Sequence, residues 1–277
     1  MLKDFFKKNM KIILKQFIRI KIFRILYELA SEVLWDDKLN IKHNGIDLNF
    51  IAPNQVNRWR VRTFSTEEPE TLNWIDKFEN DSVFWDIGAN ICLYSCYAAK
   101  KSNCKVYAFE PSIFNLHLLG KNIWLNNLVS KITIFSLPLT HKINEDTFNM
   151  SSMEPGGANS TFSENYDYKG DKNKEIFNFS TLGVPADKIV DFFNIPKPTY
   201  VKLDVDGIEH LIIKGGLNSL KSAKSILVEI DEKFEERSKG VEKNLLSLGF
   251  EFKEKRQQEN LKGTKYESTF NQIWDKK

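Results

Sequence analysis

Cysteine is scarce in this chain of 277 residues, and its few positions exclude several kinds of site. The three cysteines, Cys92, Cys96 and Cys104, fall within one short stretch. Cys92 and Cys96 are one helical turn apart, but no second pair and no nearby histidine completes a tetrahedral zinc set. An odd number of cysteines without an export signal is typical of reduced thiols in the cytoplasm. We therefore expect a cytoplasmic protein whose cysteines are small, buried hydrophobic residues.

The chain also lacks a long apolar run and a strong net charge. Its N-terminal segment has no uninterrupted apolar core, so the sequence predicts neither a secretory signal nor a membrane span there. The formal net charge of +3 is too small to indicate nucleic acid as a partner. Positive charge is instead concentrated at the start, where the first 24 residues hold eight Lys or Arg against the single acid Asp4.

Residues 1–40 are predicted to form a separate basic, amphipathic helical segment. Two stripes at helical spacing define it, one basic (Lys8, Lys11, Lys15, Arg19) and one apolar (Phe6, Met10, Ile13, Phe17). Such a helix can lie on an anionic membrane surface, here the inner face of the membrane. Packing on its own domain, or on a second copy in a homo-oligomer, is an equally open interpretation.

Residues 41–277 are predicted to form one α/β domain. After an Asn44-Gly45 hairpin, buried strands alternate with amphipathic helices. This alternation predicts a doubly wound, mainly parallel sheet of the Rossmann-like type, with an antiparallel hairpin added by the C-terminal residues. Residues 140–180 are polar and are expected to form a long loop over the acceptor site. The predicted parallel strands are residues 82–87, 105–110, 131–136, 199–205 and 225–230.

The first of these strands ends in an acid and a glycine turn, DIGAN, at residues 86–90. Ligands of open parallel sheets bind at the carboxyl ends of the strands. The next strand ends in Glu110, whose carboxylate can accept both hydroxyls of a ribose. A dinucleotide site needs G-x-G-x-x-G, whereas here the single glycine follows Asp86, which would repel a pyrophosphate. The pattern favours S-adenosylmethionine over NAD; in the alternative interpretation, Asp86 caps a helix and Gly88 only turns the chain.

Three segments, taken in order, carry a resemblance to a known family. They are WDIGANICLYSCYAAK, VYAFEPSIFNLHLLGKNIWLNN and VKLDVDGIEHLIIKGG. They resemble the FkbM-type methyltransferases, class I enzymes that use S-adenosylmethionine and generally methylate hydroxyl groups, and the resemblance covers about residues 50–275. Two positions depart from the family. Cys92, expected on the first helical turn, stands where a further glycine is usual, and Asp206 stands where DVEG is usual.

The resemblance implies a cofactor site residue by residue. Glu68 would lie near the amino-acid end of S-adenosylmethionine, Glu110 would bind the ribose, and Asp204 would face the reacting centre. The other implied positions are Asp86, Gly88, Ala89, Asn90 and Tyr94 beside the methionine part, Pro111 and Ser112 near the adenosine, and Ser136 and Leu137 near the adenine.

A hydroxyl acceptor is a poor nucleophile, so a base near its proton accelerates methyl transfer. Asp204 is the first candidate for this base or for an anchor of the acceptor, and His141 and Asp206 are the next candidates. Asp206 and Glu209 flank Gly207, and simple capping of the following helix is an equal alternative for both. No metal site is predicted, although paired carboxylates would suit Mg²⁺.

The acceptor is predicted to be a hydroxyl of a sugar in a surface glycan or its lipid-linked precursor. The polar stretch supplies side chains that suit the hydroxyl edges and C–H faces of a sugar: Asn159, Ser160, Phe162, Tyr166 and Tyr168. Three alternatives stay open. They are a polyketide-like alcohol as the acceptor, a non-catalytic cofactor-binding subunit of a glycan-assembly complex, and an NAD-dependent oxidoreductase.

Overall fold

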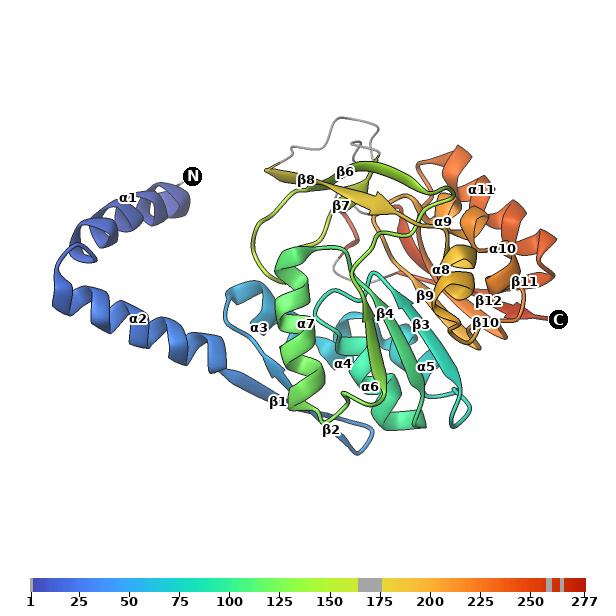
Figure 1. The fold of residues 1–277 in the computed structure, drawn as a ribbon, viewed down its shortest axis with the longest axis horizontal. Helices are drawn as coiled ribbons and strands as arrows, with labels where there is room; N and C mark the ends of the chain where they lie inside the picture. Colours follow the sequence, from blue (N-terminus) through green and yellow to red (C-terminus); the bar gives the residue numbers. More distant parts are fainter. Residues whose placement is uncertain (1, 164–175, 258–260, 265–266) are drawn as a thin grey trace.

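The central sheet of the computed structural model has seven strands in the order β11-β12-β10-β9-β3-β4-β5 (Figure 1). β12 (Thr269–Lys276) runs antiparallel to both of its neighbours, β10 and β11 (Phe250–Arg256). The predicted mainly parallel, doubly wound sheet with a C-terminal antiparallel hairpin is confirmed. The structure describes residues 2–163, 176–257, 261–264 and 267–277. The parallel strands are β3 (Val83–Ile87), β4 (Lys105–Phe109), β5 (Ile132–Phe135), β9 (Tyr200–Leu203) and β10 (Ser225–Asp231).

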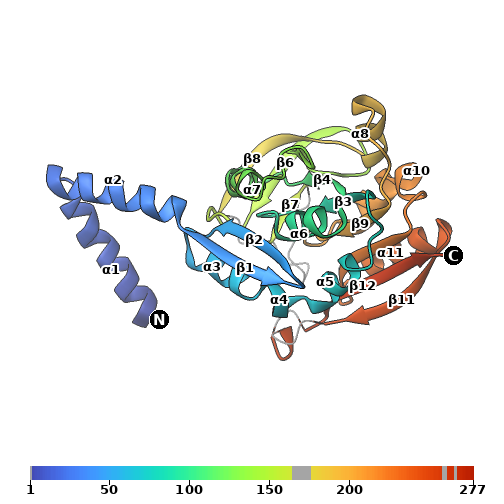
Figure 2. The ribbon, with the colours of Figure 1, turned by 90° about the horizontal axis from the view of Figure 1, so that it is seen from below.

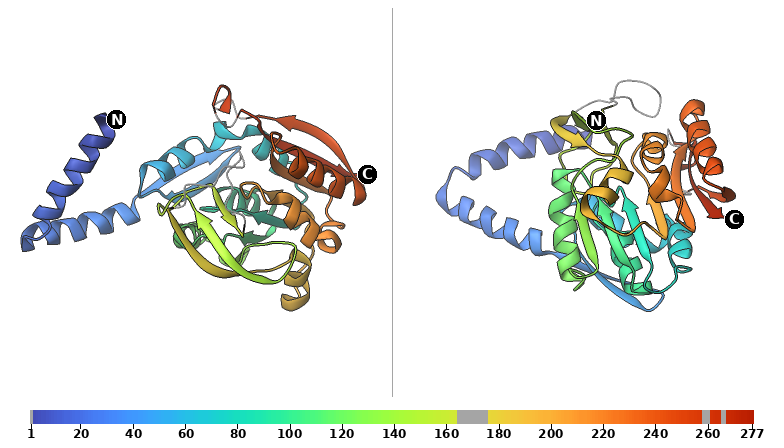
Figure 3. Two further views of the ribbon diagram at one scale, coloured as in Figure 1. Left: turned by 90° about the horizontal axis from the view of Figure 1, so that it is seen from above. Right: turned by 45° about the vertical axis from the view of Figure 1, so that its right-hand side comes forward.

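The N-terminal segment is helical, as predicted, but it forms two helices rather than one. α1 (Leu2–Phe17) and α2 (Lys21–Asp36) project from the domain as a bent N-terminal arm (Figures 1, 2 and 3). Ile20 is extended, with φ −85° and ψ 125°, and no side chain caps α2. The break falls in FIRIKIF, whose alternating β-branched isoleucines have a low helix propensity. Among the described residues, no helix is long and apolar enough to cross a membrane.

A hairpin and three short helices precede the first strand of the central sheet. β1 (Lys38–His43) pairs with β2 (Ile46–Ile51) around Asn44 and Gly45. Both turn residues have positive φ, 45° and 80°, as a two-residue type I′ hairpin requires. The helices that follow are α3 (Gln55–Arg62), α4 (Phe64–Glu67) and α5 (Pro69–Ile75).

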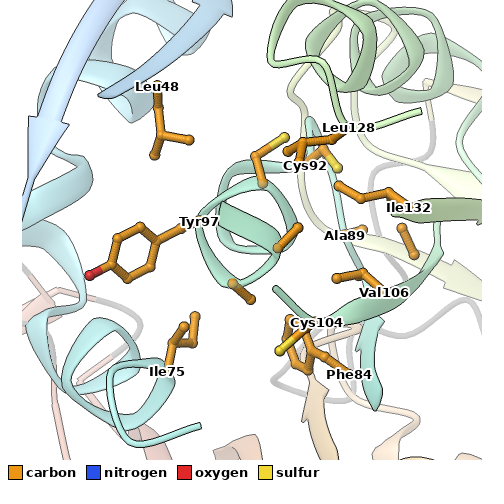
Figure 4. Close-up of a cluster of buried hydrophobic side chains, with 14 of the residues drawn as sticks. Leu48, Ile75, Phe84, Ala89, Cys92, Tyr97, Cys104, Val106, Leu128 and Ile132 are labelled. Carbon is orange, nitrogen blue, oxygen red and sulfur yellow. The ribbon is translucent and has the colours of Figure 1, made fainter. Parts of the chain in front are cut away.

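Helices cover both faces of the central sheet, and the sheet separates two hydrophobic cores. Phe84 of β3 points into one core and Trp85 into the other, as the alternation of side chains along a strand requires. The core around Phe84 includes α6 (Leu93–Ser102), α7 (Ile113–Leu125) and the three cysteines. All three cysteines are buried and form no disulfide, as predicted, and Figure 4 shows Cys92 and Cys104 within this core. The other core includes α8 (Ala186–Phe193), α9 (Glu209–Gly215), α10 (Leu217–Leu220) and α11 (Glu235–Ser247).

The polar stretch 140–180 is not the long loop that its composition predicts. β6 (Asn144–Met150), β7 (Ser160–Phe162) and β8 (Phe177–Gly183) form a separate antiparallel sheet in the order β7-β6-β8. Hydrophobic packing holds this small sheet against the central sheet, because Phe148 and Phe162 belong to the same core as Ile87 and Phe109, at the ends of β3 and β4. The predicted acceptor residues Tyr166 and Tyr168 lie outside the described residues.

Candidate functional site

A cavity of about 400 Å³ opens where the carboxyl ends of β3, β4 and β9 meet. β3 lies between β4 and β9, so the chain changes direction across the sheet here, and such switch points bind ligands in open α/β sheets. The volume is within the range of small-molecule sites. Most of the predicted site residues line this switch-point cavity: Glu68, Gly88, Ala89, Asn90, Tyr94, Glu110, Pro111, Leu137, Asp204 and Asp206.

Four predicted residues do not line the cavity. Asp86 is buried, 1% exposed, and Ser112 caps α7 by accepting the N–H of Asn115 at 3.4 Å. Ser136 follows β5 outside the lining, and His141 lies beside the end of α9, close to Gly215. That these four residues contact a ligand stays a prediction, and Ser112 has a structural role as the N-cap of α7.

The turn after β3 is built by residues with left-handed backbone. Gly88 has φ +90°, and a Cβ there would lie 1.8 Å from the Asp204 carbonyl oxygen, so only glycine permits this approach of β3 to β9. Cys92 has φ +76°, which explains why a glycine is usual at this position in the family that the sequence resembles. The predicted place of Cys92 on the first helical turn is wrong, because α6 begins at Leu93.

Glu110 is held at the tip of β4 by two backbone donors. Its Oε2 accepts the N–H of Asn90 and its Oε1 accepts the N–H of Ser112, both at 2.8 Å. Burial raises the pKa of Glu110 to about 7, although these hydrogen bonds act in the opposite direction. The Asn115 side chain is a third hydrogen-bond partner of this carboxyl group. A carboxylate has about four acceptor sites, so Glu110 retains capacity for a ribose hydroxyl.

Lys202 is a central residue of the site that the sequence interpretation missed. It lies in β9 directly beside Asp86 of β3, and its side chain is 2% exposed. Its Nζ lies 2.5 Å from Asp204 Oδ2 and 5.2 Å from the centre of the Tyr94 ring. Burial alone would lower the pKa of Lys202, but Asp204, Glu68 and Asp86 together raise it. The available signal was the alternation in YVKLDV, which places Lys202 and Asp204 two residues apart.

The two aspartates after β9 have opposite electrostatic environments. Burial opposes ionisation of Asp204, but Lys202 lowers its pKa below the ordinary value. Burial and the neighbouring Asp204 raise the pKa of Asp206 to about 6. β9 ends at Leu203, so the two do not share a strand face; Asp206 has φ +60°, a conformation that aspartate tolerates better than most residues. Its Oδ2 accepts the N–H of Ser160 at 3.1 Å.

Glu209 does not cap α9, the role that was one of its two predicted alternatives, because among the described residues no side chain hydrogen-bonds at the N-terminal cap of this helix. Its Oε1 accepts the N–H of Gly207 at 2.9 Å and that of Val205 at 3.4 Å, within the turn that leads into α9. The side chain also lines the cavity, and burial raises its pKa to about 7. Glu209 therefore fixes the turn that carries Asp206.

Residues 155–160, here called the bridging segment, close the cavity on one side. Asn57 and Asn54 both donate to the Pro155 carbonyl, at 2.9 and 3.0 Å. Asn90 donates to the Gly157 carbonyl at 3.0 Å, and Asn115 accepts the N–H of Gly156 at 2.8 Å. The bridging segment thus connects α3 with the turn that follows β3 and with α7. Of these asparagines, only Asn90 was among the site residues predicted from the sequence.

The lining of the cavity fits a ligand with positive charge and an apolar ring. The cationic side chains of the lining are Arg60 and Lys202. They are outnumbered by its acidic side chains, which are Glu67, Glu68, Glu110, Asp204, Asp206, Glu209, Glu229 and Asp231. Apolar side chains gather beside the tip of β4: Phe109, Pro111, Leu137, Pro138, Leu139 and Phe148. S-adenosylmethionine has a sulfonium, an ammonium and an adenine, and the acidic and apolar parts of the lining match these groups.

The same arrangement disfavours a pyrophosphate. The N–H groups of Gly88 and Ala89 both donate to the Phe109 carbonyl, at 2.9 and 3.0 Å, so they are not directed at a ligand. The acidic lining therefore favours a sulfonium donor over NAD.

Comparisons with known proteins agree with this chemistry. The sequence model of the Methyltransferase FkbM domain matches residues 86–252. The chain is 25% identical over 217 residues to the hexuronic acid methyltransferase AglP of Haloferax volcanii, covering 78% of this chain and 80% of that protein. The domain match confirms the resemblance drawn from the sequence and, with it, S-adenosylmethionine as the methyl donor.

Solved structures with a related fold are more distant. A precorrin-6y C5,15-methyltransferase from Geobacter metallireducens is 16% identical with a TM-score of 0.45, covering 76% of this chain and 87% of that one. The fibrillarin pre-rRNA processing protein of Methanococcus jannaschii is 11% identical with a TM-score of 0.45, covering 87% of this chain and 84% of that one.

Replacing Lys202 by methionine should strongly destabilise the protein. The variant leaves Glu68, Asp86 and Asp204 without their buried cation, which costs roughly 3–5 kcal/mol. Urea unfolding at pH 8 and pH 6 measures the loss, which should be smaller at pH 6 because the carboxyl groups then take up protons. Lys188→Met, which removes an exposed pair with Asp191, is the control and should cost less than about 1 kcal/mol. Equal costs for the two variants would contradict the role of Lys202.

Cofactor binding should weaken as the pH falls through about 7. Glu110 is ionised above its pKa of about 7 and accepts the ribose hydroxyls, whereas below it the carboxyl holds a proton. Calorimetry should show the affinity for S-adenosylmethionine falling by up to about tenfold between pH 8 and pH 6. Glu110→Gln should bind more weakly, by roughly 1–3 kcal/mol, and lose this dependence. The surface variant Glu79→Gln should keep it; an unaltered profile in Glu110→Gln would remove Glu110 from the site.

Proposed function

The chain belongs to the FkbM methyltransferase family, and we propose that it is an O-methyltransferase that methylates a hydroxyl of a sugar, most directly in a glycan or its precursor. One observation carries this proposal. A single cavity joins a cofactor side, with Glu110, Asn90 and Tyr94, to an acceptor side, with Asp204 and Asp206. A transferase needs both in one space, because the acceptor oxygen must reach the methyl group in line with the sulfur.

The cofactor side is arranged to hold each end of S-adenosylmethionine, which supplies an activated methyl group. Glu110 accepts the ribose hydroxyls, and the apolar side chains near Leu137 enclose the adenine. Glu68 also lines the cavity, where Tyr94 is hydrogen-bonded to it. Asp86 lies outside the cavity lining and acts through its neighbours. Its Oδ2 accepts the Ser95 hydroxyl at 2.6 Å, and its negative charge raises the pKa of Lys202.

On the acceptor side, Asp206 is the proposed base and Asp204 the proposed anchor. The pKa of Asp206, about 6, lies close to the pH at which the base must be free, which is where general-base catalysis is efficient. Asp204 is a weaker base because Lys202 stabilises its ionised form, and it is better suited to accept a hydrogen bond from the acceptor. His141 lies outside the lining and is the weakest of the three candidates.

A sugar is supported as the acceptor by the polar and aromatic side chains of the cavity and by the relative. Asn159, Ser160 and Phe162 line the acceptor side. The name of the Haloferax volcanii relative states that it methylates a hexuronic acid. A small-molecule alcohol is the second candidate acceptor. Incubation with radiolabelled S-adenosylmethionine, glycan fractions and simple alcohols would separate the two. Cofactor binding without transfer to any acceptor would favour a non-catalytic subunit.

The N-terminal arm is proposed to contact the inner face of an anionic membrane, beside a lipid-linked acceptor. α2 has no buried residue, and the described side chains of α1 from Phe5 to Phe17 are all exposed. They combine apolar residues such as Phe6 and Ile13 with basic ones, each worth about 1 kcal/mol at an anionic surface. Covering of the arm by a second copy of the chain is the alternative.

Asp206→Asn should lower kcat by roughly 10²–10⁴-fold, the usual contribution of a general base. In the wild-type enzyme, kcat should rise with pH through about 6 as Asp206 loses its proton. Asparagine retains an acceptor for the Ser160 N–H but cannot take the proton, so the variant should lose this limb of the pH profile. Asp191→Asn, at an exposed ion pair, should behave like the wild type. A wild-type pH profile in Asp206→Asn would transfer the role to another residue.

Deletion of residues 1–33 should abolish binding to anionic liposomes without impairing cofactor binding. Trp35 is retained because it contacts His117 of α7, with ring centres 4.9 Å apart. In flotation assays the full chain should rise with vesicles that contain anionic lipid and remain at the bottom with zwitterionic ones. Equal flotation of both proteins would eliminate the membrane role, and a dimer lost on deletion would favour the second copy.

A further inference from the structure

Two neighbouring residues of α3, Trp59 and Arg60, line the acceptor side of the switch-point cavity. Trp59 is 44% exposed, so its ring remains available at the mouth of the cavity. Arg60 is half-buried. Neither is required by the cofactor chemistry described above. An exposed aromatic face next to a guanidinium is the combination that recognises a sugar ring carrying an anion.

The guanidinium of Arg60 is held in place but is not neutralised by contact. Its Nε donates to the Gly156 carbonyl at 3.0 Å. In the part of the chain that the structure describes, its terminal nitrogens donate no hydrogen bond and form no ion pair. Lys202, the other cation of the lining, is by contrast in direct contact with Asp204. Arg60 therefore keeps a pair of donors for a bidentate partner.

The surroundings fix Arg60 firmly. Gly156 has φ +83°, and a Cβ there would lie 2.1 Å from Asn57 Oδ1, so the bridging segment packs tightly on α3. The same segment continues to Ser160, whose N–H is bound by Asp206. Arg60 is thus connected through five consecutive residues, Gly156 to Ser160, to the aspartate proposed as the base. Its charge also acts on Asp204 and Asp206, which places it within electrostatic range of the reacting centre.

We infer that the acceptor is an acidic sugar, whose carboxylate is bound by Arg60 while its ring lies against Trp59. This inference rests on the proposed function and narrows its substrate class. A carboxylate and a phosphate would both pair with a guanidinium. The carboxylate is favoured because the lining is rich in carboxylates, which repel a dianionic phosphate more strongly than a monoanion.

The test compares two acceptors that differ only in the anion. One is an oligosaccharide with a terminal uronic acid, and the other is the same oligosaccharide with that carboxyl group reduced to the alcohol. With the full-length wild type, kcat/KM should be at least about tenfold higher for the acid, since a site built for a polar partner rejects the analogue that lacks it. Arg60→Met should remove most of this preference and leave the affinity for S-adenosylmethionine unchanged. Arg60→Lys should restore part of it.

Arg62→Met is the matched control, because Arg62 belongs to the same helix and is exposed outside the cavity lining. It should retain the full preference for the acid. If Arg60 only supported the bridging segment, Arg60→Met would lower kcat/KM equally for both acceptors, and the inference would be overturned. A sugar phosphate used in preference to the uronic acid would also overturn it. Transfer to neither oligosaccharide, with cofactor binding intact, would instead count against the proposed function.

Discussion

The structure of the site depends on one buried cation, Lys202, and on the carboxylates that surround it. Asp86 comes from β3, Asp204 follows β9, Glu68 precedes α5, and Tyr94 belongs to α6. These elements approach each other at the carboxyl edge of the sheet, where several acids would otherwise repel one another at short range. Lys202 makes their convergence stable and leaves the cavity with a net negative lining. The same pairing lowers the basicity of Asp204, so the proton-accepting role passes to Asp206.

A second constraint joins the two halves of the cavity. Asparagines of α3, of the turn after β3 and of α7 all bind the backbone of the bridging segment. Amide side chains suit this task, because each offers both a donor and an acceptor without adding charge to an acidic site. The position of Arg60 relative to Asp206 is therefore determined by a network of neutral hydrogen bonds rather than by helix packing alone.

Local patterns were sufficient for the central sheet and for the cofactor side. Strand periodicity located β3, β4 and β9, and the acid at each tip identified Glu110 and Asp204. The sheet of β6, β7 and β8 could not be predicted, because Asn144 pairs with Gly183 across a long polar interval that has no hairpin signal. Lys202 was missed because one charged residue in an apolar strand is understood only when its partners from three other elements are known. The left-handed Cys92 and the break in the N-terminal arm are backbone effects that side-chain patterns do not report.

The placement of β12 inside the sheet has a consequence for how the protein is made. In the described structure β11 pairs only with β12, which follows it in the chain, and β12 in turn covers the edge of β10. During synthesis β10 and β11 therefore each present an edge with unpaired backbone groups until β12 leaves the ribosome. Such open edges invite association between nascent chains. The basic residues near the end of β11, Lys253, Lys255 and Arg256, place charge on one of these two strands, and charge of this kind discourages edge-to-edge aggregation.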